Sequence, residues 1–211
     1  MENNSSSTEE LKAIRKMMEE STKFLSLSGL SGVFIGLFAI GGAIIAWVRI
    51  LDSGNIHFDE YLKGFSGNGA DTVRWQLIAD ALTVLLLSLA TALYFSYRNA
   101  RQSVKKFWTP ASKKLFFNLF IPLFTGGFFA FILIVQKNLQ LIIPVFLIFY
   151  GLSLINAGKF TYNEIFYLGI LEIIIGLVSA FFPAQGILFW ILGFGILHIV
   201  YGVMMYRKYE V

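Results

Sequence analysis

The chain has 211 residues and a formal net charge of +4, and 56% of its residues are hydrophobic while only 14% are charged. Soluble domains carry about 25% charged residues, so this composition excludes an ordinary soluble domain and indicates a protein whose side chains are solvated by lipid. The absence of cysteine excludes disulfides, thiolate catalysis, Cys-ligated zinc and iron–sulfur clusters. The positive charge does not indicate nucleic-acid binding, because the cations follow the membrane segments described below.

Residues 1–23 are polar, and we expect them to form a cytoplasmic tail, on the charge distribution given below. Ser7 and Glu10 have the spacing of a capping box, which predicts that a helix begins there. The apolar residues that follow share one helical face: Leu11, Ile14, Met17 and Met18. We expect a short amphipathic N-terminal helix lying on the membrane surface or on the protein's own loops. The alternative is a docking helix for a cytoplasmic protein partner.

Six apolar runs come next, over residues 24–50, 75–97, 115–135, 139–157, 165–182 and 187–206. Each can cross a hydrocarbon core of about 30 Å, which needs about 20 residues and accepts about 17–25. The runs are continuous, whereas the strands of a membrane barrel would alternate. The sequence therefore predicts an all-α membrane domain over residues 24–211, a polytopic bundle of six transmembrane helices in three hairpins, with an external loop over residues 51–74.

The lysines and arginines predict the orientation, because cytoplasmic loops are enriched in them. Four lie on one side of the predicted bundle, at Arg49, Lys63, Arg74 and Lys137. Thirteen lie on the other side: Lys12, Arg15, Lys16, Lys23, Arg98, Arg101, Lys105, Lys106, Lys113, Lys114, Lys159, Arg207 and Lys208. We therefore expect both termini in the cytoplasm and a multi-pass protein of the inner (plasma) membrane.

Small residues predict where helices pack closely. In the first run Ser28, Gly32 and Gly36 recur at four-residue spacing, which lets another backbone approach; packing within the chain is expected, and a homo-oligomer is the alternative. Thr109 and Pro110 have the pattern of a helix N-cap and first helical residue. Two prolines are expected to kink or open the third and fourth helices, Pro122 and Pro144.

A weak internal repeat appears near the C-terminus. Residues 169–177 (GILEIIIGL, with Gly176) resemble residues 195–203 (GILHIVYGV, with Gly202), and the fourth and sixth runs share an Ile-x-Tyr-Gly pattern. The last two hairpins are either a duplicated two-helix unit or a chance match between apolar helices. Gly176 and Gly202 are the candidate packing glycines of this repeat.

Three ionisable residues lie within apolar runs, where such residues are costly and indicate function: Asp80, Glu172 and His198. Glu172 and His198 occupy the same column of the repeat, and each lies 13 residues from Gln185, so both are expected near mid-bilayer. The pair could hold a proton or bind a solute, or it could be an interhelical hydrogen bond that only stabilises the fold. For Asp80 we expect an outer gate or anchor, or a local ion pair with Arg49 or Arg74.

Two functions are compatible with these residues. The first is binding or transport of a proton or small solute at the mid-membrane site of Glu172 and His198. The second is a membrane scaffold, assembly factor or sensor that contacts a partner through its tail and its basic loop. No catalytic motif and no cofactor pattern is visible, and His57, Asp59 and Glu60 are only a weak metal candidate, so neither an enzyme nor a metal site is expected.

Four stretches resemble an uncharacterised family of small six-helix bacterial inner-membrane proteins: residues 14–33 (IRKMMEESTKFLSLSGLSGV), 109–123 (TPASKKLFFNLFIPL), 149–177 (FYGLSLINAGKFTYNEIFYLGILEIIIGL) and 193–210 (GFGILHIVYGVMMYRKYE). The rhythm of the glycine-rich hairpins is also similar to that of HdeD-like acid-resistance membrane proteins. The resemblance implies a bacterial inner-membrane protein. The family has no assigned activity, so no functional residue follows from it.

Overall fold

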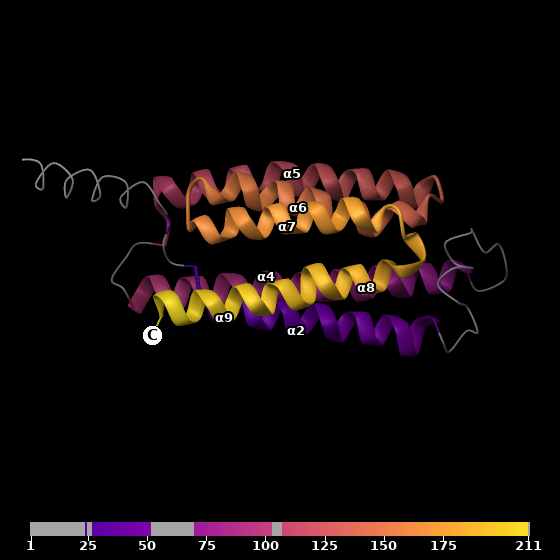
Figure 1. The fold of residues 1–211 in the computed structure, drawn as a ribbon, viewed down its shortest axis with the longest axis horizontal. Helices are drawn as coiled ribbons and strands as arrows, with labels where there is room; N and C mark the ends of the chain where they lie inside the picture. The colour runs from indigo at the N-terminus through magenta and orange to yellow at the C-terminus, as the bar shows by residue number, and fades with distance from the viewer. Residues whose placement is uncertain (1–23, 25–26, 52–69, 103–106, 211) are drawn as a thin grey trace, which may run out of the picture.

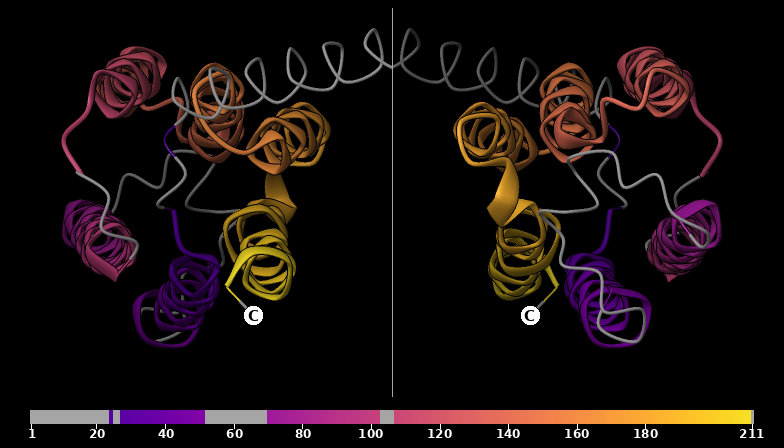
Figure 2. Two further views of the ribbon diagram at one scale, coloured as in Figure 1. Left: turned by 90° about the vertical axis from the view of Figure 1, so that its left-hand side faces the viewer. Right: turned by 90° about the vertical axis from the view of Figure 1, so that its right-hand side faces the viewer.

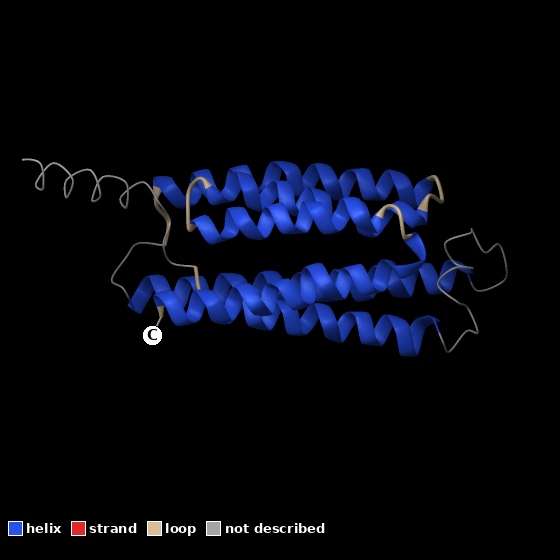
Figure 3. Ribbon diagram, viewed as in Figure 1, coloured by secondary structure: helices blue, strands red, loops and turns tan. Residues whose placement is uncertain are grey.

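The computed structural model describes residues 24, 27–51, 70–102 and 107–210, and these form helices joined by short turns, with no strand among them (Figure 3). The long helices are α2 (Gly29–Ile45), α4 (Ala70–Gln102), α5 (Pro110–Val135), α6 (Ile142–Gly158), α7 (Asn163–Ser179) and α9 (His198–Tyr209). The short segments are η1 (Ala46–Leu51), η3 (Leu139–Leu141), η4 (Pro183–Gln185), α8 (Gly186–Trp190) and η5 (Ile191–Leu197). The predicted tail helix and most of the external loop lie outside the described residues.

Among the described residues, five helical stretches are long and apolar enough to cross a membrane: Gly29–Leu51, Asp71–Gln102, Pro110–Val135, Leu139–Gly158 and Pro183–Tyr209. Large apolar side chains on their outer faces are exposed, such as Leu86 of α4 at 64% and Phe124 of α5 at 61%. A water-soluble protein does not leave so much apolar surface uncovered. The expectation of an all-helical, multi-pass membrane protein is therefore confirmed at this level.

The six long helices form two rows of three. Viewed along the bundle, α5, α6 and α7 lie in one row and α4, α2 and α9 in the other (Figures 1 and 2). We call these the α6 row and the α2 row after their central helices, each of which packs against both of its row neighbours. The rows meet along α7 and α9, with α8 and η5 also touching the α6 row.

The described part of the chain does not pack its last hairpin as a close pair. The helices α7 and α9 follow one another in the chain, but α7 packs mainly on α6, and α9 packs mainly on α2. The helical segment after η4 therefore crosses from one row to the other (Figure 1). This differs from the expected set of three hairpins because close glycine contacts favour α2 over α7 as the neighbour of α9.

The contact between α2 and α9 repeats the contact between α6 and α7. A Cβ on Gly36 of α2 would lie 2.5 Å from the carbonyl oxygen of Gly195 and 2.6 Å from Cγ1 of Ile199. A Cβ on Gly151 of α6 would lie 2.6 Å from the carbonyl oxygen of Gly169 and 2.7 Å from Cγ1 of Ile173. Both crossings leave no room for a side chain, so only glycine allows the two backbones to approach this far.

Other contacts agree with the same correspondence. Gly202 of α9 faces the backbone nitrogen of Val33, and Gly176 of α7 faces that of Ile148. Phe34 of α2 stacks on Phe95 of α4 with ring centroids 5.6 Å apart, and Phe149 of α6 lies 6.2 Å from Phe129 of α5. The central helices run in opposite directions along the bundle, as do α7 and α9 (Figure 1). The two rows are thus approximately related by a twofold axis across the bundle.

The first turns of α2 and α5 are capped in different ways. Thr109 accepts from the backbone N–H of Ser112, and the Ser112 side chain accepts from the N–H of Thr109, with Pro110 at the first helical position. This capping box confirms the predicted start of α5. The N–H of Gly29, at the start of α2, instead donates to the carboxylate of Glu210 near the C-terminus.

The two helix prolines occupy different positions. Pro122 lies inside α5. Pro144 is the third residue of α6, in the first turn, where backbone N–H groups have no intrahelical partner. Its missing N–H therefore removes no interior hydrogen bond from α6.

Candidate functional site

Glu172 lies near the middle of α7 and is 0% exposed. Its neighbours on the same face of the helix are also buried: Leu168, Gly169, Gly176 and Ser179. The two glycines bring α7 close to α6, and the same face turns toward the α2 row. The packing of α7 therefore fixes a carboxyl group in the interior between the rows.

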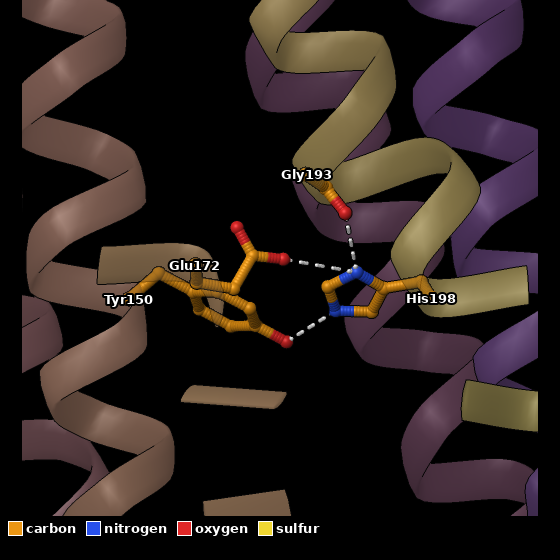
Figure 4. Close-up of polar contacts among 4 residues, drawn as sticks. All are labelled: Tyr150, Glu172, Gly193 and His198. Atoms are coloured by element: carbon orange, nitrogen blue, oxygen red, sulfur yellow. Dashed lines mark hydrogen bonds and ion pairs between the residues drawn. The ribbon is translucent and has the colours of Figure 1, made fainter. Parts of the chain in front are cut away.

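His198 is the first residue of α9 and is 2% exposed. It follows the π-helical segment η5, and its Nδ1 lies 3.1 Å from the carbonyl oxygen of Gly193 in that segment. The same Nδ1 lies 3.4 Å from Oε1 of Glu172 (Figure 4). The structure thus brings together the two residues that occupy one column of the sequence repeat.

Tyr150 of α6 completes the cluster, because its hydroxyl lies 2.8 Å from Nε2 of His198 (Figure 4). With a neutral imidazole, the Tyr150 hydroxyl donates to Nε2 and the Nδ1–H of His198 donates to Gly193. We refer to Tyr150, Glu172, Gly193 and His198 as the Tyr–Glu–His cluster. Its members come from three different helical stretches and both rows.

The sequence alone did not distinguish Tyr150 from its polar neighbours in α6. Ser153 and Asn156 are also polar, yet each donates to a carbonyl of its own helix, that of Phe149 and Leu152 respectively. Of these three described residues, Tyr150 is the one that bonds to another helix. The spacing within α6 carries no signal for this difference, because it depends on where α9 lies.

The carboxyl group of Glu172 has no hydrogen-bond partner among the described residues, on either oxygen. Oε2 also occupies the space beside Gly193, where a Cβ would lie 2.7 Å from it. Cδ2 of Leu147 lies still nearer to that Cβ position, at 2.5 Å, so both side chains fill the space beside Gly193. A buried polar group without a partner is costly, so its presence needs an explanation.

The surroundings of the cluster are apolar and closed. Leu147 is 0% exposed and lies beside Gly193, and the ring of Phe194 packs 5.3 Å from Tyr150 and 6.2 Å from His198. Two open hollows of the described structure lie elsewhere, one beside Lys159 and Asn163 and one along α9. Neither includes a residue of the cluster.

Asp80 of α4 does not join the cluster. Its carboxylate lies against Gly42 of α2, where a Cβ would be 3.3 Å from Oδ2. Gly42 is six residues beyond the Gly36 contact, about 9 Å further along α2. Arg74 pairs with Asp71 at 2.9 Å instead of with Asp80. Within the described residues Asp80 forms no ion pair.

The described residues contain no group of three histidine, aspartate or glutamate side chains that could hold a metal ion. The weak candidate at His57, Asp59 and Glu60 lies outside the described residues. Comparison with family models, curated proteins and solved structures finds no match to this chain. The function of the cluster has to follow from its geometry.

The chemistry open to the cluster is set by its charge. A bare carboxylate beside a neutral imidazole would leave a buried, unpaired charge, which costs several kcal/mol. Two arrangements avoid this: a neutral carboxylic acid beside a neutral histidine, or a carboxylate beside an imidazolium. Both hold one more proton than the bare pair, so the closed cluster keeps one exchangeable proton between Glu172 and His198.

Proposed function

We propose that the chain is a six-span protein of the bacterial inner membrane with both termini in the cytoplasm. In this topology α7, with 17 residues, is added as a span to the five stretches given above, at the lower end of the range of about 17–25 residues that cross a bilayer. It runs the length of the bundle beside α6 (Figure 1). The basic residues gather at the end where α2, α5 and α7 begin, which favours the cytoplasm for that end.

We infer that this protein binds and releases a proton at the Tyr–Glu–His cluster, either to carry protons or to couple a proton to movement of a small solute. The observation that supports this function is the fully buried carboxyl group of Glu172, which has no hydrogen-bond partner in the described structure and lies 3.4 Å from His198. A purely structural glutamate would be expected to have its oxygens bonded.

A proton fits the closed cluster better than a solute does. Glu172 and His198 are buried, so a solute could reach them only if the helices separated, whereas a proton needs only an existing lone pair. Two titratable groups of the described residues belong to the cluster beside Glu172, Tyr150 of α6 and His198 of α9, and Tyr201 of α9 packs with Leu168 one helical turn away. None of these brings a fixed charge that would neutralise the carboxylate permanently.

The test is infrared spectroscopy of the purified protein in lipid, because a carboxylic acid has a carbonyl band that a carboxylate lacks. We expect a band that disappears in Glu172→Gln and that shifts in deuterated buffer, since the proton exchanges when the cluster opens. Asp80→Asn is the matched control, because Asp80 carries the other carboxyl group within an apolar helix of the bundle. It should leave the Glu172 band unchanged.

Two outcomes would overturn the proposal. One is the absence of any Glu172-dependent change in carboxyl or imidazole bands across the accessible pH range. The other is a Glu172-dependent band that does not shift in deuterated buffer over hours, because a dry structural contact keeps its proton. The scaffold alternative depends on residues 1–23 and on the basic loop that includes residues 103–106, which lie outside the described residues.

A further inference from the structure

The end of α9 binds α7 through two side chains. Nζ of Lys208 lies 2.6 Å from Oε1 of Glu164, and the hydroxyl of Tyr209 donates to the same oxygen at 3.0 Å. The ring of Tyr209 also lies 4.3 Å from that of Tyr162, just before α7. We call Glu164, Lys208 and Tyr209 the latch. It joins the α6 row to the α2 row.

The next residue makes a contact of a different kind. Glu210 binds the N–H of Gly29 and accepts from the hydroxyl of Ser28 at 3.2 Å. Ser28 and Gly29 begin α2, which belongs to the same row as α9. This contact therefore holds one row together, and it would not be broken by separation of the two rows.

The opposite end of the bundle is closed by apolar packing. Leu139 before α6 packs in one buried cluster with Ala43, Leu51, Val73 and Ile187, which come from α2, η1, α4 and α8. Opening this end would expose a continuous apolar core to water. The latch has a charged group in contact with solvent, since Lys208 is 58% exposed, and exposed ion pairs are weak because water and salt screen them.

The latch lies on the direct line to Glu172 along α7. Glu164 is eight residues from Glu172, about 12 Å along the helix, and both lie on the side of α7 that meets α9. Between them is Leu168, which packs with Leu154 and Tyr201 in a buried cluster that also links the rows. If the latch opens, this cluster remains as a barrier, together with the hydrogen bonds that join Phe24 to Phe160 and Thr161 at the same end.

We propose that the latch is the cytoplasmic gate of the Tyr–Glu–His cluster, and that its release lets the two rows separate at this end and admits water to Glu172. The proposal deepens the proposed function, on which it depends for the identity of the proton. Sites at the interface of two oppositely oriented helix sets are typical of carriers that open by movement of one set against the other. The approximate twofold relation between the rows gives this chain that arrangement.

The experiment uses the natural absence of cysteine. Leu168→Cys places a thiol between the latch and Glu172, and the rate of labelling by a charged, membrane-impermeant reagent is measured in inside-out vesicles. Glu164→Gln is added to weaken the latch, and Glu210→Gln is the matched control, because it weakens a contact at the same helix end within one row. Leu154→Cys on α6 is a second reporter, which gives an independent reading if Leu168→Cys does not fold.

We expect Glu164→Gln to raise the labelling rate of both reporters about tenfold, because the open population grows as the latch weakens. Glu210→Gln should change the rate by less than about twofold on the same scale. A reporter on the far side of Glu172, Ser179→Cys, should show no increase in inside-out vesicles. Equal rates in the Glu164→Gln and Glu210→Gln backgrounds, or an increase at Ser179→Cys as large as at Leu168→Cys, would overturn the gate.

The same labelling in a Glu172→Gln background separates this inference from the proposed function. Labelling reports water access and needs no proton on Glu172. An increase that persists in Glu172→Gln supports the gate even if the infrared band fails to appear. Conversely, a Glu172 band with unchanged labelling would keep the proton site and remove the latch as its gate.

Discussion

The two close helix pairs of this protein share one packing scheme but differ in chemistry. In α6 and α7, and again in α2 and α9, a glycine on each helix meets the backbone of the other, with isoleucines filling the space one turn away. In the first pair, the equivalent polar position holds Glu172 on a regular helix. In the second it holds His198, directly after the π-helical segment η5.

The residues that hold the helices together differ from the residues that form the site. The glycine contacts need no polar groups and would form a stable pair in either row. The polar residues lie where the two pairs face each other, so neither pair alone contains a complete site. The π-helical segment η5 leads into α9, and it supplies both the Gly193 carbonyl for His198 and space beside the Glu172 carboxyl.

The largest effects should come from the shared scheme. Gly36→Ala and Gly151→Ala each place a Cβ within 2.6 Å of a backbone carbonyl oxygen, and we expect each to lower the free energy of unfolding by about 1–3 kcal/mol, the usual cost of overpacking. Gly41→Ala and Gly127→Ala are the controls, because nothing lies within 4 Å of either. Thermal unfolding in detergent measures all four. Unequal losses for Gly36 and Gly151 would break the equivalence of the two pairs.

Gly193→Ala tests the contact between η5 of the α2 row and the carboxyl group of Glu172. The added methyl would lie 2.7 Å from Oε2 of Glu172. We expect the carboxyl group to be displaced and the free energy of unfolding to fall by about 1–3 kcal/mol. In a Glu172→Ala background part of this loss should vanish, with a coupling of about 0.5–3 kcal/mol. Strict additivity in the double-mutant cycle would show that the two groups do not share this space.

Tyr150→Phe should lower the free energy of unfolding by a smaller amount, about 0.5–1.5 kcal/mol, because it removes one neutral hydrogen bond to His198. The chain has two histidines, so a His57→Gln background leaves His198 as the single imidazole signal in nitrogen NMR. We expect Tyr150→Phe to move the Nε2 resonance. Tyr167→Phe, on the exposed face of α7 with 64% exposure, should leave that resonance unchanged.

The smallest effects should come from the two helix caps, which differ in origin. Thr109→Ala removes a local capping box, and Glu210→Gln removes the charge from a cap provided by the other end of the chain. We expect the free energy of unfolding to fall by about 0.5–2 kcal/mol in Thr109→Ala. In Glu210→Gln it should fall by about 0.3–1 kcal/mol, and high salt should make this second loss smaller. Chemical denaturation at low and high salt measures both. A salt-dependent loss in Thr109→Ala would contradict the assignment of the two caps.

Part of the site could be predicted from the sequence. The matching columns of residues 169–177 and 195–203 and the equal spacing from Gln185 placed Glu172 and His198 at one depth, and the structure has them 3.4 Å apart. Tyr150 and Gly193 could not be predicted in this way. Their roles depend on α6 and η5 reaching the same point in space, and no periodicity within one helix encodes that.

The sequence by itself determined the class of protein, the positions of its long helices and the local cap at Thr109, because hydrophobic run length and side-chain-to-backbone bonding act within one segment. Only the tertiary structure decided which helices pair. The close approach of Gly29 and Gly202 joins α2 to α9 across most of the chain, and Glu210 caps a helix that begins 181 residues earlier. Such contacts depend on shape complementarity between distant segments. The partners of Glu172 and the latch of α9 follow from that choice.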